Sequence, residues 1–308
     1  MASNIVLRQE HALPGSDRST RSGRRHRGHE GRKSIVVGLD SSVFAHRALC
    51  RAVDVARAHD AHLHIVHARP RALPRFLGRE RAHTLSRNAL ARVTEEVRAK
   101  GLSVRAHVVM GSTVAAVRKK VGDLRADLVV VGAGERRLLD AVTGSTAERI
   151  ASATQRPVLV ARRAESRPYR QILVAVGLHS NPQRLHAAAM LVAPSAELCF
   201  LHAYDDPYEG VLILHGMNGA SLQRRRKELR REASAALTRS MAESGLEGHE
   251  LLLRNGMACN VIEREERERQ ANDTLFVLER ERSVVDRLVF GTACRWLLSQ
   301  GESDVLLV

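Results

Sequence analysis

Cysteine is scarce in this 308-residue chain, and its four cysteines show no paired spacing. Cys50, Cys199, Cys259 and Cys294 lie far apart, and no C-x-x-C motif occurs. Isolated cysteines of this kind are typically small apolar core residues. We therefore expect four reduced, buried thiols.

Long apolar runs are also absent. No stretch approaches the roughly 18 apolar residues that a membrane-spanning helix needs, and the first residues lack the apolar core of a signal peptide. The sequence therefore predicts a soluble, cytoplasmic protein without a membrane span.

Motifs for catalysis are missing as well. There is no G-x-x-x-x-G-K-[ST] segment, whose lysine would reach the terminal phosphates of a nucleotide, and no G-x-S-x-G nucleophile motif. The sequence thus predicts a protein that is not an enzyme and that would hydrolyse a bound ATP slowly.

The chain has a strong positive charge that rests almost entirely on arginine. Its formal net charge is +15 and its isoelectric point is about 10.9, but only five of its 49 basic residues are lysine. Such a balance suits acidic partners such as nucleotides, nucleic acid or anionic lipid. An arginine bias also arises from genome composition, and a solvated basic surface supports only non-specific attraction. Nucleic-acid binding is therefore disfavoured.

Length and composition predict two domains of about 140 residues each behind a polar tail. Residues 1–33 are rich in Arg, Ser, Gly and His and carry eight basic against three acidic residues, a net of +5. We expect this tail to be disordered. It is either an electrostatic arm for nucleic acid or membrane, or a dispensable extension, and the extension is favoured.

Strand and helix patterns alternate from Ser34 onward. Short β-branched runs such as SIVVGLD and ADLVVVGA alternate with amphipathic stretches such as SSVFAHRALCRAVDVARAHD. Nearly continuous apolar strands that alternate with helices are typical of a parallel sheet covered on both faces. We therefore expect a doubly wound α/β fold.

The same order of segments occurs twice. QILVAVGLHS repeats SIVVGLDSS, AELCFLHAY repeats AHLHIVHAR, and the end of the chain repeats TGSTAERIASATQRPVLVA. The shift is 137 residues at Ile35 and Ile172, and 147 residues at Val158 and Val305. The chain is thus an internal duplication, with domains at 34–163 and 170–308 and a linker at 164–169.

Several positions in this repeat resemble the universal stress protein family in its two-domain tandem form. They are Asp40 after the first strand, Gly111 before the third helix, the segments ADLVVVG and RPVLV, and Gly144-Ser145. The resemblance extends over nearly all of the chain after residue 33. It implies two five-stranded parallel α/β domains of the Rossmann-like, adenine-nucleotide-binding type, paired as a pseudo-dimer. In some members of the family it also implies bound ATP or AMP.

The resemblance also implies a set of nucleotide contacts in the first domain. Asp40 matches the acid that binds adenine or ribose, and Ala68 matches a small residue against the adenine ring. The phosphate signature of the family is G-x-x-G, nine residues and G-[ST]. The residues that correspond to it here are Gly132, Gly134, Gly144, Ser145 and Thr146.

The physical basis of that signature is independent of the family. Glycines at the carboxyl end of a parallel strand let backbone N–H groups approach phosphate oxygens. A Gly-Ser pair at a helix N-terminus adds unpaired amides and a partial positive charge. The first part departs from the signature, since Gly132 and Gly134 form G-x-G. Counting 17 residues from Asp127 to Gly144, against 18 from Asp273 to Gly291, indicates a one-residue deletion in this loop.

Structural roles explain the same residues without a ligand. Gly144-Ser145 also suits a simple helix cap, and Asp40 suits the cap of the helix that begins near Ser42. Nucleotide binding by the first domain is the favoured interpretation.

The second domain departs further from the signature. Gly177 stands in place of the acid, Leu278 and Glu281 replace the loop glycines, and only Gly291-Thr292 survives. Glu279 and Glu281 would oppose phosphate with like charge, at a cost of the order of 1 kcal/mol. We expect no ATP in this domain, which serves as a packing partner.

Four histidines invite comparison. His62 and His64 share one strand face, as two metal ligands would, but no third ligand is near in sequence. A surface role is therefore favoured for them. His67 and His202 occupy equivalent strand ends and are expected to make the same core hydrogen bond.

Two charged runs remain. The segment 221–237 has an apolar stripe and many arginines, so it is most simply a surface helix, although a basic amphipathic helix can also lie on anionic lipid or RNA. Its stripe consists of Leu222, Leu229, Ala233, Ala236 and Leu237. The segment 262–270 alternates charges at i, i+4, which is typical of a solvated helix face.

These observations predict a regulator of the stress response that binds ATP or AMP in its first domain and responds through an unknown protein partner. The rival hypothesis is an interaction scaffold that binds no nucleotide, which the shortened Gly132–Gly134 loop favours. A third, nucleic-acid binding through the tail, is the least favoured. The sequence leaves open whether two chains form a homodimer.

Overall fold

The computed structural model of the protein describes residues 32–39, 43–69, 79–134, 146–163, 167–269, 273–280, 296–298 and 300–308. The predicted tail lies outside these residues except for Arg32 and Lys33. None of the helices in these ranges is long and apolar enough to cross a membrane.

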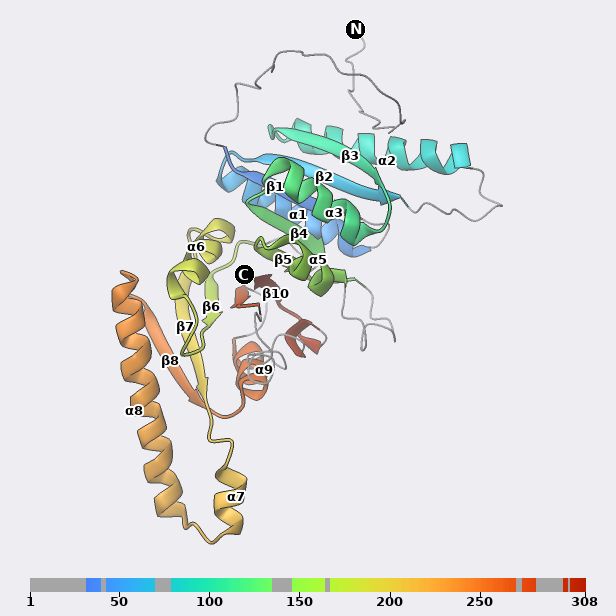
Figure 1. Ribbon diagram of the computed structural model, residues 1–308. Helices are drawn as coiled ribbons and strands as arrows, with labels where there is room; N and C mark the ends of the chain where they lie inside the picture. Colours follow the sequence, from blue (N-terminus) through green and yellow to red (C-terminus); the bar gives the residue numbers. More distant parts are fainter. Residues whose placement is uncertain are drawn as a thin grey trace, which may run out of the picture.

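The first half alternates strands and helices in the predicted order (Figure 1). Its strands are β1 (Ser34–Leu39), β2 (His62–Arg69), β3 (Val104–Met110), β4 (Leu128–Gly132) and β5 (Val158–Ala161). Its helices are α1 (Val43–Ala58), α2 (Arg79–Ala99), α3 (Thr113–Leu124) and α5 (Thr146–Thr154). A Cβ at Gly38 would lie 3.1 Å from Val117 Cγ2, so this strand glycine allows α3 to pack closely on β1.

The second half repeats this order and adds a short helix. Its strands are β6 (Gln171–Ala175), β7 (Glu197–Tyr204), β8 (Glu250–Asn255), β9 (Thr274–Leu278) and β10 (Asp304–Leu307). Its helices are α6 (Pro182–Val192), α7 (Glu209–Leu214), α8 (Gly219–Glu243) and α9 (Ala258–Glu268). Helix α6 has a well-defined start, because Asn181 caps it and Pro182 occupies its first turn.

All ten strands form one sheet in the order β3-β2-β1-β4-β5-β10-β9-β6-β7-β8. Pairing is parallel within each half, as predicted, and the two halves join where β10 pairs antiparallel with β5. The fold is therefore the expected doubly wound α/β type, twice over. Because of the antiparallel junction, the carboxyl ends of the first-half strands and of the second-half strands lie at opposite sides of the sheet. Each of these two sides, formed by strand ends, is called an edge of the sheet below.

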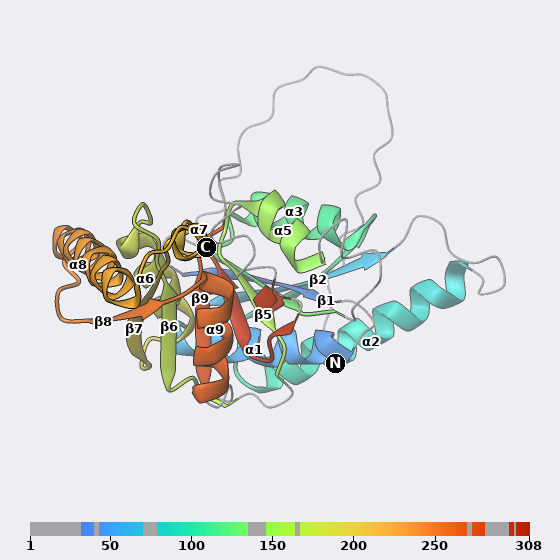
Figure 2. The same ribbon diagram turned by 90° about the horizontal axis from the view of Figure 1, so that it is seen from below.

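Helices cover both faces of the sheet (Figure 2). Helices α1, α2, α6 and α8 pack on one face, and α3, α5 and α9 pack on the other. Each apolar core runs across the junction: Leu63 and Phe200 belong to the first, Val129 and Phe276 to the second. Each such side chain stabilises the fold by about 1.5–3 kcal/mol when buried. The two halves are thus packed as a pseudo-dimer with shared cores.

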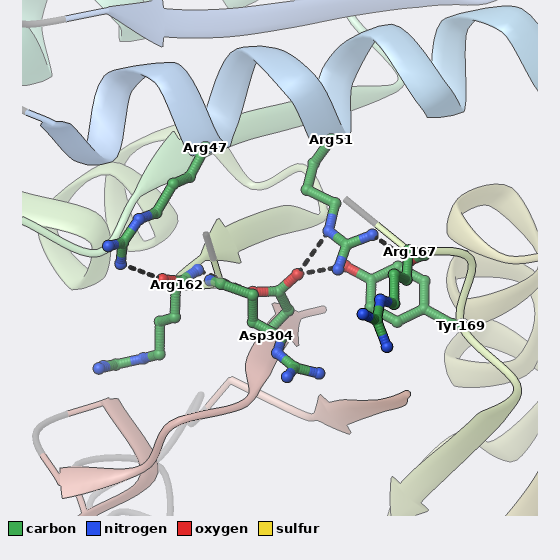
Figure 3. Close-up of polar contacts among 7 residues, drawn as sticks. Arg47, Arg51, Arg162, Arg167, Tyr169 and Asp304 are labelled. Atoms are coloured by element: carbon green, nitrogen blue, oxygen red, sulfur yellow. Dashed lines mark hydrogen bonds and ion pairs between the residues drawn. The ribbon is translucent and has the colours of Figure 1, made fainter. Parts of the chain in front are cut away.

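A buried carboxylate stabilises the junction (Figure 3). Asp304 begins β10 and is 0% exposed. Its Oδ2 accepts hydrogen bonds from Arg51 Nε of α1 at 2.7 Å and from the Tyr169 hydroxyl at 2.6 Å. Its Oδ1 accepts from the backbone N–H groups of Arg162 at 2.7 Å and Arg163 at 3.1 Å. These donors supply the polar partners that a buried carboxylate requires.

The side chains around Asp304 also hold the connection between the halves. The guanidinium of Arg51 lies 4.3 Å from the centre of the Tyr169 ring, and its Nη1 donates to the Arg167 carbonyl at 2.5 Å. Burial, followed by the negative charge of Asp304, raises the pKa of Tyr169 well above its usual value, so the phenol stays a donor. Arg162 donates to the Gly301 carbonyl at 3.0 Å. Both flanks of the connection are therefore bonded across the junction.

Two glutamates in the 262–270 run contradict the predicted solvated face. Glu265 is 1% exposed and is paired with Arg254 at 2.6 Å and Arg269 at 3.0 Å. Burial raises its pKa, but the hydrogen bonds from the two arginines outweigh burial and lower it overall. Glu266 is also buried and accepts from the N–H groups of Glu302 and Ser303. The i, i+4 pairing of Glu265 with Arg269 follows from the charge alternation, but the burial does not, because Arg254 and the N–H groups of Glu302 and Ser303 belong to other segments.

The predictions for the cysteines and for the basic helix are correct in part. Of the three free cysteines that the structure describes, only Cys199 is buried, while Cys50 and Cys259 are half-buried. Cys294 lies outside the described residues. Helix α8 is a surface helix as predicted, but it buries Ala233, Leu237 and Met241 and exposes Ala236.

Candidate functional site

The candidate site of the first half is the edge of the sheet where β1 and β4 end. Chain order reverses between these neighbouring strands, and open α/β sheets bind ligands beside such a reversal. Gly38 pairs with Val131, and Leu39 pairs with His67. The structure therefore brings the predicted residues Ala68 and Gly132 to one edge, on either side of the end of β1. Asp40, Gly144 and Ser145 lie outside the described residues.

A histidine fixes the strand ends beside this edge in both halves. His67 Nδ1 lies 3.1 Å from the Leu39 carbonyl, and His202 Nδ1 lies 2.8 Å from the Val176 carbonyl. Because a carbonyl only accepts, each ring donates through Nδ1. The predicted shared hydrogen bond is confirmed, and it holds the residue that precedes Asp40 in one half and Gly177 in the other.

The Gly132–Gly134 loop leaves the sheet in a conformation that requires glycine. Gly134 has a φ of +75°, a region that side chains other than glycine rarely adopt. The N–H of the intervening Ala133 donates to the Ala161 carbonyl at 3.0 Å, so this amide is already used. Among the described residues, no heavy atom lies within 4 Å of where a Cβ of Gly134 would stand.

Two helices begin at the same edge and lie side by side on one face (Figure 2). Helix α3 begins after Gly111, which has a φ of +132°, and Ser112, whose Oγ accepts from the Ala115 N–H at 3.3 Å. Helix α5 begins at the predicted residue Thr146, which is exposed. Helix N-termini favour anions through their unpaired N–H groups and partial positive charge.

Sequence reasoning missed Arg69, which ends β2 directly after Ala68. Its carbonyl accepts from the Gly111 N–H at 2.8 Å, and its Nε lies 3.2 Å from Met110 Sδ. Its Nη1 is buried and has no hydrogen-bond partner in the part of the chain that the structure describes. A buried guanidinium N–H without an acceptor is costly, and a phosphate oxygen would satisfy it. Only the buried environment identifies this arginine among 49 basic residues.

The corresponding edge of the second half has a different architecture. The Gly177 N–H donates to Ser180 Oγ at 2.8 Å, which closes the loop after β6 on itself. The Arg280 N–H donates to the Val308 carbonyl, as Ala133 does to Ala161 in the first half. The structural counterpart of Gly132 is therefore Glu279, and at the same shift Gly134 corresponds to Glu281.

This pairing corrects two details of the sequence comparison. Ile35 pairs with Leu128 and Ile172 with Leu275, so the counterpart of Asp127 is Thr274, not Asp273. The extra residue of the second half thus precedes β9, and the two loops to Gly144 and Gly291 have equal length. The second-half position that replaces the first loop glycine is Glu279 rather than Leu278. The first half still has G-x-G, at Gly132 and Gly134, where the family signature has G-x-x-G.

His62 and His64 of β2 have partners in or next to β3, the outermost strand of the first half. His64 Nδ1 lies 3.2 Å from His107 Nε2, and His62 Nδ1 lies 2.7 Å from Ser103 Oγ. Burial and the nearby charges of Lys120 and Arg105 lower the pKa of His107 to about 4. Within the described ranges, no group of three or more His, Cys, Asp or Glu residues could hold a metal ion.

Comparisons with known proteins agree with this architecture. A sequence model of the universal stress protein family matches residues 31–162 and again 168–308. The solved structure of PA1789 from Pseudomonas aeruginosa PAO1, described as functionally unknown, is 19% identical over 90% of this chain and 92% of its own, with a TM-score of 0.61. A universal stress protein from Archaeoglobus fulgidus DSM 4304 is 16% identical over 89% of this chain and 95% of its own, with a TM-score of 0.62.

These two similarities show the fold alone, because both identities are low. A universal stress protein solved in complex with cAMP is 24% identical over 42% of this chain and 95% of its own, but its TM-score of 0.36 carries no argument about this chain. A comparison with curated protein sequences gave no significant match.

Proposed function

Because the chain belongs to the universal stress protein family, whose sequence model matches both halves, we propose that its first half binds an adenine nucleotide, ATP or AMP. In this proposal the protein is a cytoplasmic, non-enzymatic regulator of the stress response. Nucleotide occupancy changes the surface that it presents to a protein partner. The two units of the proposal are the domains at 34–163 and 170–308 with the connection at 164–169.

One observation carries the proposal: the Gly132–Gly134 loop leaves the sheet at the chain reversal, with Gly134 at a φ of +75°. That conformation lets backbone approach a ligand without a side chain in between. Arg69 adds a buried N–H that lacks an acceptor among the described residues, and α3 and α5 begin at the same edge. These groups suit a polyanion bound at the edge of the sheet.

The remaining contacts follow from the family resemblance. Asp40 binds the ribose or the base, and Ala68 lies against the adenine ring. The phosphates are bound by Gly132, Gly134, Gly144, Ser145 and Thr146. Slow turnover is expected, since the chain has no P-loop lysine to neutralise the terminal phosphates.

The second half binds no ATP in this proposal. Glu279 and Glu281 replace the two loop glycines, and like charges near a phosphate in a partly dry crevice are unfavourable. The Gly177 amide is already bonded to Ser180 Oγ. One nucleotide per chain is therefore expected.

The test is nucleotide analysis of full-length protein purified without added ligand, followed by titration with ATP and AMP. Adenine nucleotide in the denatured extract, or saturable binding at one site per chain, supports the proposal. No binding at millimolar nucleotide by folded protein contradicts it and favours an interaction scaffold.

The scaffold is the second candidate, and specific observations favour it. The loop is one residue shorter than the family signature, and the N–H groups of Ala133 and Gly111 already donate to Ala161 and Arg69. A site with fewer available amides binds phosphate less tightly. The titration separates the two candidates.

A further inference from the structure

The apolar surface of this protein is concentrated at one end of the second half. Among the described residues, seven large apolar side chains are well exposed, and six of them follow the carboxyl ends of β6, β7 or β8. These six are Leu178, Tyr208, Val211, Ile213, Leu214 and Met257. Large exposed apolar side chains scattered singly are ordinary, but their concentration marks an interaction surface.

Helix α7 contributes three of these side chains, its N-cap Tyr208 adds a fourth, and the helix buries none of its own residues. Leu214 is 85% exposed and Tyr208 is 65% exposed. Its segment EGVLIL is apolar around most of the helix, and a helix that is apolar all round is normally surrounded by other groups. Figure 1 shows α7 and the start of α8 projecting well beyond the strands, so the described part of the protein does not cover this helix.

Ion pairs fix α7 against the first turns of α8. Arg225 is bonded to Asp206, and Arg226 is bonded to Glu209, with Nε to Oε2 at 3.0 Å. These bonds lower the pKa of Asp206 and of Glu209, so both carboxylates stay charged near neutral pH. The two helices therefore form a defined hairpin, α7–α8 (residues 209–243).

A basic stripe runs along the outer face of this hairpin. Arg224, Lys227 and Arg231 are exposed and recur at helical spacing, whereas the same helix buries Ala233, Leu237 and Met241. No carboxylate among the described residues pairs with them. At about 1.5 Å of rise per residue, all three lie within about 20 Å of the start of α8.

Apolar side chains at the tip and cations just above them match an anionic bilayer. Aliphatic side chains enter the headgroup region, while arginine and lysine reach lipid phosphates along their own stems. Nucleic acid would use the cations and could stack a base on Tyr208, but it would leave the aliphatic Val211, Ile213 and Leu214 exposed, because bases stack on aromatic side chains. A second copy of the chain would bring an identical basic stripe, which would repel this one. Contacts among four apolar side chains also bury too little area for a stable dimer interface.

We propose that the α7–α8 hairpin docks the protein on an anionic phospholipid surface, with α7 at the level of the headgroups and the stripe of Arg224, Lys227 and Arg231 on lipid phosphates. The lost nucleotide site of the second half is thereby replaced, at the same edge of the sheet, by a membrane contact. The first-half site lies at the opposite edge and stays open to ligand.

The test is flotation of the full-length protein with vesicles of phosphatidylcholine alone and with about 30% phosphatidylserine at about 0.1 M salt. We expect binding only to the anionic vesicles and its loss at about 1 M salt. Reversal of the stripe by R224E, K227E and R231E together is expected to weaken binding about 100-fold. The apolar variant I213Q/L214Q is expected to weaken it about tenfold.

The charge-matched control is R92E/R118E/R156E, which reverses three exposed arginines of the first half. It keeps the net charge of the stripe variant and should retain most of the binding. Equal loss in the control, or unchanged binding in both hairpin variants, would overturn the proposal, since the attraction would then be general or would come from elsewhere, such as residues 1–33. So would binding to single-stranded RNA but not to anionic vesicles, or a dimer that I213Q/L214Q dissociates without a change in vesicle binding.

Discussion

Arg51 in α1 of the first half donates from Nε to Asp304 Oδ2 in β10 of the second half at 2.7 Å, and both side chains are buried. Neither residue has a like counterpart in the duplication. At the shift of 137 residues between the halves Arg51 corresponds to Ala188, and at the shift of 147 residues Asp304 corresponds to Pro157. The junction is therefore asymmetric, and one carboxylate holds α1, the connection and β10 together.

Replacing Asp304 should destabilise the whole protein. Asp304→Asn leaves the Arg51 guanidinium buried without its counter-charge, and breaking a buried pair from one side typically costs about 3–5 kcal/mol. We expect a loss of this size in the free energy of unfolding in urea. The matched control is Asp60→Asn, whose exposed pair with Arg32 should contribute less than about 1 kcal/mol. Equal effects of the two changes would contradict this role of Asp304.

Gly134 should matter more for binding than for stability. Gly134→Ala places a side chain in a left-handed conformation, which costs about 1–2 kcal/mol, and it stiffens the loop that we assign to phosphate. Nucleotide affinity should fall at least tenfold. In the control Gly122→Ala, which lies within α3 and whose Cβ would meet none of the described residues within 4 Å, stability should rise by about 0.5–1 kcal/mol with unchanged affinity. Unchanged affinity in Gly134→Ala would remove this loop from the site.

Arg69 should contribute to the affinity for nucleotide rather than to the stability of the fold. Arg69→Met keeps the apolar stem and removes the buried N–H that lacks an acceptor. Loss of one charge-assisted hydrogen bond, worth about 1.5–3 kcal/mol, should weaken ATP binding about 10- to 100-fold. The same change at the exposed Arg105, on the neighbouring strand, serves as the control in calorimetric titration. If Arg69→Met binds like wild type and is more stable, the arginine has no part in binding.

His107 should make stability depend on pH in the acidic range. Its pKa is lowered to about 4 by burial and by Lys120 and Arg105, from an ordinary value of 6.5. Between these values the unfolded chain binds a proton that the folded chain does not, so the free energy of unfolding falls as pH falls from 6.5 toward 4. Above pH 6.5 neither the folded nor the unfolded chain binds this proton, so His107 no longer makes stability depend on pH.

His107→Asn should reduce this slope without abolishing it, because burial also lowers the pKa of His186 and His202. Thermal unfolding midpoints at pH 7 and pH 4.5 measure the difference. A variant whose midpoint falls as much as that of wild type would show that His107 does not titrate in this range.

Patterns local in sequence predicted most of the fold. Apolar runs such as ADLVVVGA predicted the strands, the repeated order predicted the duplication, and the equivalent positions of His67 and His202 predicted their shared bond. These features depend on neighbours along the chain, or on equivalence between the halves. One sequence is enough to reveal both.

Features that depend on distant segments were missed. The merger into one sheet requires the ends of both halves, β5 and β10, to pair. The burial of Glu265 in helix α9 depends on Arg254 of strand β8, and Asp304 has no counterpart that would single it out. Counting from Asp127 and Asp273 failed because Thr274 is the true counterpart, which only strand register reveals. Asp40, Gly144 and Ser145 of the predicted site lie outside the described residues and stay predictions.

The most direct test of nucleotide binding by the first half alone is calorimetric titration of the full-length protein with ATP and AMP, in wild type, Gly144→Asp and Gly291→Asp. These changes place the same carboxylate at equivalent loop ends of the two halves. We predict one site per chain in wild type and in Gly291→Asp, and none in Gly144→Asp, with all three proteins folded. Binding that survives Gly144→Asp, or is lost in Gly291→Asp, would contradict the assignment.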